Sequence, residues 1–141
     1  MKKGLRFLIF ITVLTFFLTA YSTTVKTFGE SEFFLATISE DGVQRADVIV
    51  DSYSFEPNHL VVSVGKPVEL RLKSVTSFIP HNFTLNYPET GLAVNQDISH
   101  GQDVKVRFTP TMTGSYEFFC DKKFLFDSHK KKGMKGILEV R

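Results

Sequence analysis

The chain has 141 residues, of which 43% are hydrophobic, and its 17 Lys and Arg against 15 Asp and Glu give a formal net charge of +2. This length allows one globular domain and excludes a multidomain enzyme. Nothing in the composition, charge or motifs indicates a nucleic-acid partner.

Residues 1–22 have the pattern of a secretory signal peptide. A basic start precedes an apolar run over residues 7–20, and small residues suited to cleavage follow. The alternative is an uncleaved N-terminal membrane anchor, but this run is short against the roughly 20 residues that a spanning helix needs. We therefore expect cleavage after Ala20 or Ser22 and a periplasmic or otherwise exported protein. No second long apolar run follows, so no membrane span is expected after signal removal.

The predicted domain covers residues 46–141. Residues 23–45 lack sustained alternation of apolar and polar residues, and we interpret them as a linker or a loosely attached N-terminal segment. Residues 46–57 and 59–65 are short β-rich runs on either side of a Pro-Asn turn signal.

The clearest strand patterns lie further along the chain. Residues 68–74 and 104–110 alternate apolar and charged side chains, which is the period of a half-buried strand. In residues 81–87 the alternation places His81, Phe83 and Leu85 on one face and Asn82, Thr84 and Asn86 on the other. Several short strands with turns about ten residues apart predict an all-β fold, an antiparallel β-sandwich or barrel.

The single cysteine, Cys120, lies at the end of the β-rich run 114–120. In an exported chain it has no partner for an internal disulfide, so it dimerises, is buried and inert, or is occupied by another group. His129 and Met134 follow it. Two imidazoles, a thiolate and a weak thioether are the donors of a blue-copper centre.

The second imidazole has to come from elsewhere in the chain. His81 is the best candidate because it shares a face with apolar residues at the start of a strand, whereas His59 and His100 lie in a turn and a loop and are expected to be solvated. Each residue also has a structural interpretation: a core histidine, a buried cysteine, a methionine that fills a gap. Their combination on an exported β-domain favours the metal site.

In these residues the chain resembles the cupredoxins, the group of plastocyanin and azurin. The resemblance rests on "PHNF" (residues 80–83), Cys120, His129 and Met134, and it covers about residues 47–141. It implies a Greek-key β-sandwich that binds one type 1 copper ion, with His81, Cys120 and His129 as equatorial ligands and Met134 as the axial one. Family members carry an Asn that steadies the ligand loop, and we assign its nearest equivalent to Ser74. The resemblance also implies that His129 lies nearest the surface.

The function implied is one-electron transfer without catalysis. A multicopper oxidase needs histidines on both sides of the cysteine, whereas Cys120 lies between Phe119 and Asp121. A nitrite reductase needs a second copper site, and the binuclear site of oxidase subunits needs two cysteines. The alternative function is periplasmic copper storage, delivery or resistance.

The charged and apolar residues near the predicted site indicate what kind of partner protein the chain binds. Residues 121–141 carry seven Lys and Arg against three Asp and Glu. This charge is either an ordinary solvated face or a surface that attracts a redox partner protein with an acidic docking face. Residues 124–126 either form an apolar surface around the metal or pack inward. We expect a monomer.

Overall fold

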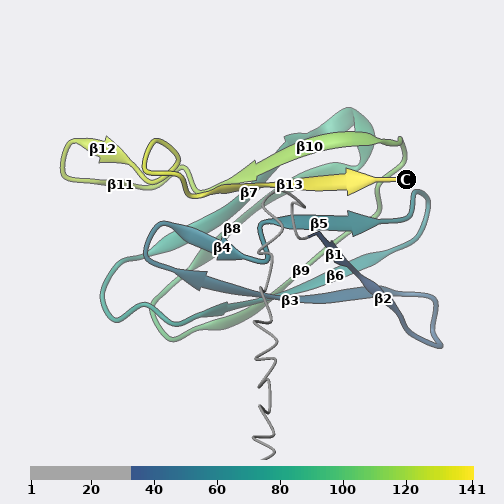
Figure 1. The fold of residues 1–141 in the computed structure, drawn as a ribbon, viewed down its shortest axis with the longest axis horizontal. Coiled ribbons are helices and arrows are strands. Elements are labelled where there is room, and N and C mark those ends of the chain that lie inside the picture. The colour runs from purple at the N-terminus through teal and green to yellow at the C-terminus, as the bar shows by residue number, and fades with distance from the viewer. Residues whose placement is uncertain (1–32) are drawn as a thin grey trace, which may run out of the picture. The chain divides into compact units, whose positions relative to one another are not determined.

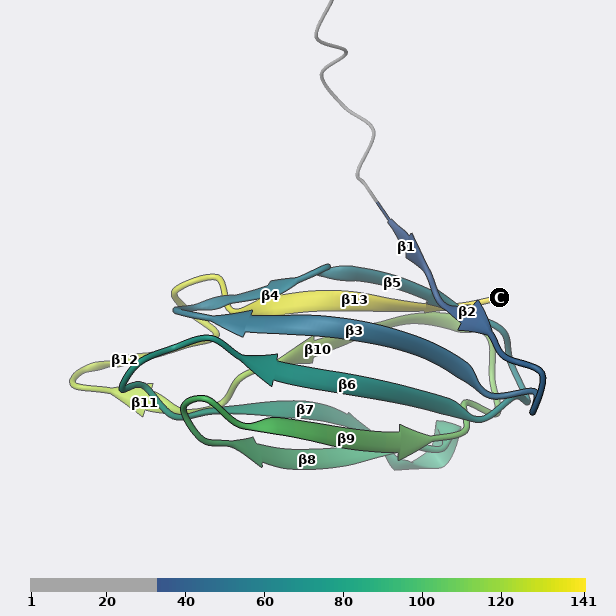
Figure 2. The same cartoon turned by 90° about the horizontal axis from the view of Figure 1, so that it is seen from below.

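The computed structural model describes residues 33–141, which form two β-sheets facing each other (Figures 1 and 2). The six-stranded sheet has the order β1 (Phe34–Leu35), β5 (His59–Val62), β13 (Lys135–Val140), β10 (Gly114–Phe119), β7 (His81–Tyr87) and β8 (Leu92–Ile98). The second sheet has the order β2 (Thr37–Ile38), β3 (Gln44–Asp51), β6 (Val68–Ser74) and β9 (Asp103–Phe108), with β4 (Ser54–Glu56) paired to β3. A 3-10 turn, η1 (Pro88–Thr90), joins β7 to β8.

The predicted β-sandwich is confirmed, but its sheets are mixed instead of purely antiparallel. β3 pairs in parallel with β6, and β13 pairs in parallel with β5. Between β3 and β6 the chain crosses to the other sheet through β5 and then returns, so two reversals restore its direction. Periodicity identifies strands and says nothing of their neighbours, which is why the parallel pairs were not predicted.

The segment that we interpreted as a linker contributes short edge strands. β1 pairs with β5, and β2 pairs with β3. Gln44, at the start of β3, is buried, and its side chain bonds both the N–H and the carbonyl of Ser63. The predicted signal peptide, residues 1–22, lies outside the described residues. Among residues 33–141, no helix has the length and apolar character needed to cross a bilayer.

The core lies between the sheets and is built around three phenylalanines. Phe55, Phe83 and Phe118 are almost fully buried, and their ring centroids are 5.0–5.8 Å apart. Burying a side chain of this size contributes about 1.5–3 kcal/mol, with roughly 0.5–1.5 kcal/mol more for each aromatic pair. Phe83 and Phe118 lie on β7 and β10, so this cluster holds the two strands that lead to the predicted site.

An ion-pair cluster holds the outer face of the second sheet together. The carboxylate of Glu69 on β6 lies 2.9 Å from Lys105 Nζ and 2.7 Å from Arg107 Nε on β9, and 3.6 Å from Arg45 Nε on β3. Its hydrogen bonds to Lys105 and Arg107 lower the pKa of the carboxyl to about 2. The ionised carboxylate therefore connects three adjacent strands.

This cluster predicts a specific loss of stability in acid. A carboxyl with a depressed pKa stabilises the fold fully above its unfolded pKa of about 4.5, and this contribution is lost as the pH falls towards about 2. Glu69→Gln is expected to lower stability near neutral pH and to flatten the acid limb of the stability curve. Denaturant unfolding at about pH 7 and pH 3 measures both effects. Glu40→Gln, at an exposed turn, is the control, and an unchanged acid limb in Glu69→Gln would contradict the prediction.

Candidate metal centre

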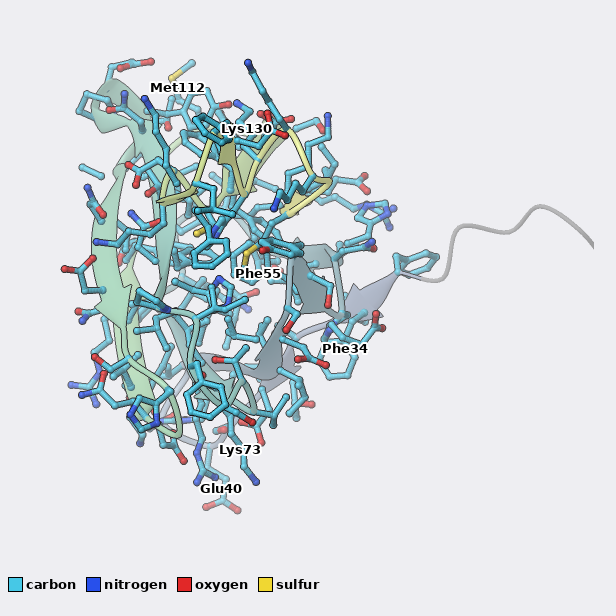
Figure 3. All side chains as sticks on the ribbon, turned by 90° about the vertical axis from the view of Figure 1, so that its left-hand side faces the viewer. Phe34, Glu40, Phe55, Lys73, Met112 and Lys130 are labelled. Atoms are coloured by element: carbon cyan, nitrogen blue, oxygen red, sulfur yellow. The ribbon has the colours of Figure 1, made fainter. Side chains whose placement is uncertain are left out.

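Three of the four predicted ligands lie at the ends of three neighbouring strands. His81 begins β7, Cys120 directly follows β10, and Met134 directly precedes β13. Antiparallel pairing of β10 with β13 aligns Phe119 with Lys135, which brings Cys120 beside Met134. Pairing of β10 with β7 aligns Phe119 with Thr84, so the start of β7 lies at the same end of the sheet. Figure 3 faces this end of the molecule.

His129 reaches the site from the loop that joins β10 to β13. This loop contains a two-stranded hairpin, β11 (Lys123–Phe124) and β12 (Asp127–Ser128), which projects beyond the sheets in Figure 1. After the hairpin the chain turns back, so that the His129 ring lies beside the ends of β7 and β10.

The structure brings the thiol and both imidazoles together. Cys120 Sγ lies 3.4 Å from Nδ1 of His129 and 3.9 Å from Nδ1 of His81, and the two Nδ1 atoms are 3.1 Å apart. Each of the three residues offers one ligand atom, and these atoms lie within 4.8 Å of one another. Met134, the predicted axial ligand, is fully buried at the same strand ends. The Nε2 atoms of His81 and His129 are buried and have no hydrogen-bond partner among the described residues, whereas both Nδ1 atoms face the sulfur.

Backbone hydrogen bonds close the ligand loop on itself. The N–H of Cys120 donates to the carbonyl of Met134 over 3.1 Å, and the N–H of Met134 donates to the carbonyl of His129 over 3.0 Å. The N–H of His129 donates to the carbonyl of Lys122 over 2.9 Å. Three ligands are thus held in place by the peptide backbone.

Asn82 contacts the predicted site, and the sequence patterns did not indicate it. Its backbone N–H donates to Cys120 Sγ over 3.4 Å, and its side-chain amide both donates to the carboxylate of Asp121 and accepts the Asp121 N–H. Ser74, the expected equivalent of the family's Asn, does not fill this role, because its hydroxyl contacts Thr76. Asn82 directly follows His81, and Asp121 directly follows Cys120. The signal in the sequence is that the two hydrogen-bonded residues, which we call the Asn82 clamp, each adjoin a predicted ligand.

The surroundings set the protonation of the donor atoms. The pKa of His81 is lowered to about 4, mainly by burial and secondly by the neighbouring His129. The pKa of His129 is also lowered, mainly by burial and secondly by the charge of Lys132. Burial raises the pKa of the Cys120 thiol. Both imidazoles are therefore neutral near pH 7 and can offer a lone pair, and a metal that binds the sulfur displaces its proton. Two neutral imidazoles, a thiol and a thioether in a closed site are consistent with a type 1 copper centre.

The other two histidines lie away from this cluster. His100 is exposed in the turn before β9, as expected. His59 begins β5 and is partly exposed, and its Nε2 lies 3.1 Å from a carboxylate oxygen of Glu139.

The apolar residues of the hairpin point to solvent. Phe124, Leu125 and Phe126 are 45%, 80% and 99% exposed, so the inward packing that we kept as an alternative is wrong. Three of the nearby lysines form ion pairs: Lys122 with Asp97, and Lys130 and Lys135 with Glu117. Lys123, in the hairpin, and Lys131, in the turn that follows it, are exposed.

Comparison with known proteins gives a family and several solved structures of the same fold. The family model described as "Cupredoxin-like domain" matches residues 8–137. The metal-binding domain of the Cu(I)-exporting P-type ATPase CopA of Streptococcus pneumoniae D39, solved with Cu(I), is 20% identical with a TM-score of 0.61, over 80% of this chain and 99% of that one.

Two auracyanins also match. Reduced auracyanin from Roseiflexus castenholzii is 15% identical with a TM-score of 0.56, over 69% of this chain and 96% of that one. Auracyanin A, a "blue" copper protein from Chloroflexus aurantiacus, is 20% identical with a TM-score of 0.54, over 71% of this chain and 100% of that one. No protein with a curated description matches the sequence.

Proposed function

The chain belongs to the cupredoxin family, and from this membership and the geometry of its donor set we propose that it is an exported type 1 copper protein that carries single electrons and catalyses no reaction. The observation that carries the proposal is the convergence of one thiol and two imidazole Nδ1 atoms in a buried site beside Met134. His81, Cys120 and His129 are the proposed equatorial ligands and Met134 the axial one.

The properties of the site support electron transfer over catalysis. When bound, copper supplies a one-electron change between Cu(I) and Cu(II). β7, the closed loop and the hydrogen bonds of Asn82 would hold the donor atoms in one arrangement while the oxidation state changes. All four donor residues are buried, which leaves a substrate no path to an open coordination position. Electron transfer then proceeds with no bond made or broken.

The test is copper loading followed by redox cycling. Addition of Cu(II) is expected to produce the intense visible absorption of a thiolate-to-copper charge transfer, which fades on reduction and returns on oxidation over repeated cycles. A colourless complex would contradict the proposal. Rapid loss of the copper to an apo-protein, without reversible cycling, would favour the alternative of copper storage, delivery or resistance.

The partner that we propose is a redox protein with an acidic face, which this chain meets as an exported monomer. The support is the position of Lys123 and Lys131 beside the exposed apolar residues of the hairpin. Complementary charge raises the rate of encounter, and an apolar centre excludes water at contact.

The expected result is a salt-dependent rate. Electron exchange with an acidic partner should slow as ionic strength rises past about 0.1 M, where the Debye length is about 10 Å. Lys131→Gln should reduce the rate at low salt and weaken the salt dependence, measured by stopped-flow absorbance. Lys66→Gln is the control, because it removes an equal charge just before the first residue of β6, at the end of the sandwich opposite to the predicted site. A rate that is independent of salt would remove the charge argument.

A further inference from the structure

His129 is covered, although it lies on a surface loop. It is 1% exposed, and its Nε2 has neither solvent contact nor a hydrogen-bond partner among the described residues. The hairpin before it and the lysine-rich turn after it are both exposed. A specific residue must therefore close the space over this imidazole.

Tyr53 contacts the His129 ring. It lies in the turn between β3 and β4, in the other sheet, and its ring meets the His129 ring with centroids 4.9 Å apart and an interplanar angle of 79°. The backbone of Tyr53 has φ of +65°, a left-handed conformation that bulky residues rarely adopt. Strained residues of this kind persist where the surrounding structure holds them, often at functional sites.

Lys132 holds the tyrosine ring from the side of the metal loop. Its Nζ donates to the Tyr53 hydroxyl over 3.2 Å and lies 4.3 Å from the centroid of that ring. The same Nζ is 5.9 Å from the ring centroid of Phe124 in the hairpin. The backbone N–H of Lys132 donates to the carbonyl of His129, so the lysine and the imidazole that it helps to cover belong to one tight turn.

We propose that Tyr53 is a positioning residue that caps His129, keeps water and external reagents from its Nε2, and forms the surface through which electrons enter and leave. The cap follows from the contacts alone, whereas its role in electron exchange rests on the proposed function. The tyrosine is not oxidised: the copper gains or loses one electron, and the partner loses or gains it. Lys132 acts through the ring by fixing its orientation.

Chemical modification of the histidines tests the cap directly. In the full chain, with and without copper, diethyl pyrocarbonate is expected to modify exposed His100 and to leave His129 and buried His81 unmodified, as read by peptide mass mapping. In Tyr53→Gly, His129 should become modified at a rate approaching that of His100, while His81 stays protected. Glycine accepts φ of +65° without strain, so this variant removes the ring and retains the turn.

Further variants separate the ring from its hydroxyl and its lysine. Tyr53→Phe keeps the ring and should keep His129 protected. Lys132→Ala should raise the reactivity of His129 several-fold, whereas Lys131→Ala removes an equal charge one position away and should leave it unchanged. If His81 also reacts in Tyr53→Gly, Tyr53→Asn replaces it, because Asn tolerates the left-handed conformation. Modification of wild-type His129 as fast as His100, or continued protection in both Tyr53 variants without the ring, would overturn the proposal.

The second part of the proposal, the role of the cap in electron exchange, is tested separately in the copper-loaded protein. Self-exchange measured by NMR line broadening should be several-fold faster in Tyr53→Gly than in the wild type, because two imidazole edges can then approach each other. The reduction potential should fall, since water near the site stabilises the more highly charged Cu(II) state. A variant that exposes His129 and leaves both quantities unchanged would overturn this part. Failure of the wild type to bind copper would instead count against the proposed function and leave the modification result standing.

Discussion

Replacing Cys120 with serine is expected to abolish the visible absorption of the copper-loaded protein and to lower its copper affinity by more than about 100-fold, since loss of an outer partner of a ligand already costs about 10–100-fold. The hydroxyl is a hard, weakly acidic donor and cannot supply the thiolate on which both the colour and the preference for copper depend. Absorbance during a copper titration measures both quantities.

The fold should survive this change, because serine is small and the Asn82 N–H can donate to its oxygen as it does to the sulfur. Circular dichroism and thermal unfolding check this. His100→Ala is the matched control: this exposed histidine lies outside the cluster, and its loss should leave the absorption unchanged. A coloured Cys120→Ser protein, or a colourless His100→Ala protein, would mean that the wrong donors have been identified.

Removal of the Asn82 side chain is expected to weaken both the fold and the site. Asn82→Ala deprives the Asp121 N–H of its acceptor and the Asp121 carboxylate of its donor. Asp121 is exposed, so water can solvate both groups, and the loss is that of two partly buried hydrogen bonds, about 0.5–1.5 kcal/mol each. Copper affinity should fall by about 10–100-fold, because the segment that carries Cys120 is then held less firmly. Denaturant unfolding and competition with a copper chelator measure the two effects.

Asn95→Ala is the control for this prediction. Asn95 is exposed and contributes only one acceptor oxygen to the Asn82 amide, so its loss should change stability by no more than about 0.5 kcal/mol. Equal effects of the two substitutions would show that the Asn82 clamp is not what supports the site.

The ligand chemistry and the strands were accessible from the sequence because both have local signatures. The alternation at residues 68–74 identifies a half-buried strand, and a thiol, an imidazole and a thioether in one short segment identify a soft metal site. His81 was selected because it shares a face with Phe83 and Leu85, and the structure places its Nδ1 in the cluster.

The supporting residues were not accessible because their burial comes from distant segments. Alternation placed Asn82 and Thr84 on the face opposite Phe83 and Leu85, yet both are buried. On that face the Asn82 amide contacts Asn95 of the neighbouring strand β8 and Asp121 of the loop after β10. Tyr53 lies in the opposite sheet, and no local pattern relates it to His129. Its left-handed backbone also has no signal in the sequence, because Gly or Asn is the usual residue in that conformation.

The backbone bonds that link residues 120, 122, 129 and 134 have a consequence for how the protein is made. They join peptide groups of the chain itself, so we expect the ligand loop to close before a metal binds, in contrast to a zinc finger, whose chain stays unfolded without zinc. In the exported protein that we propose, copper binding would then follow folding.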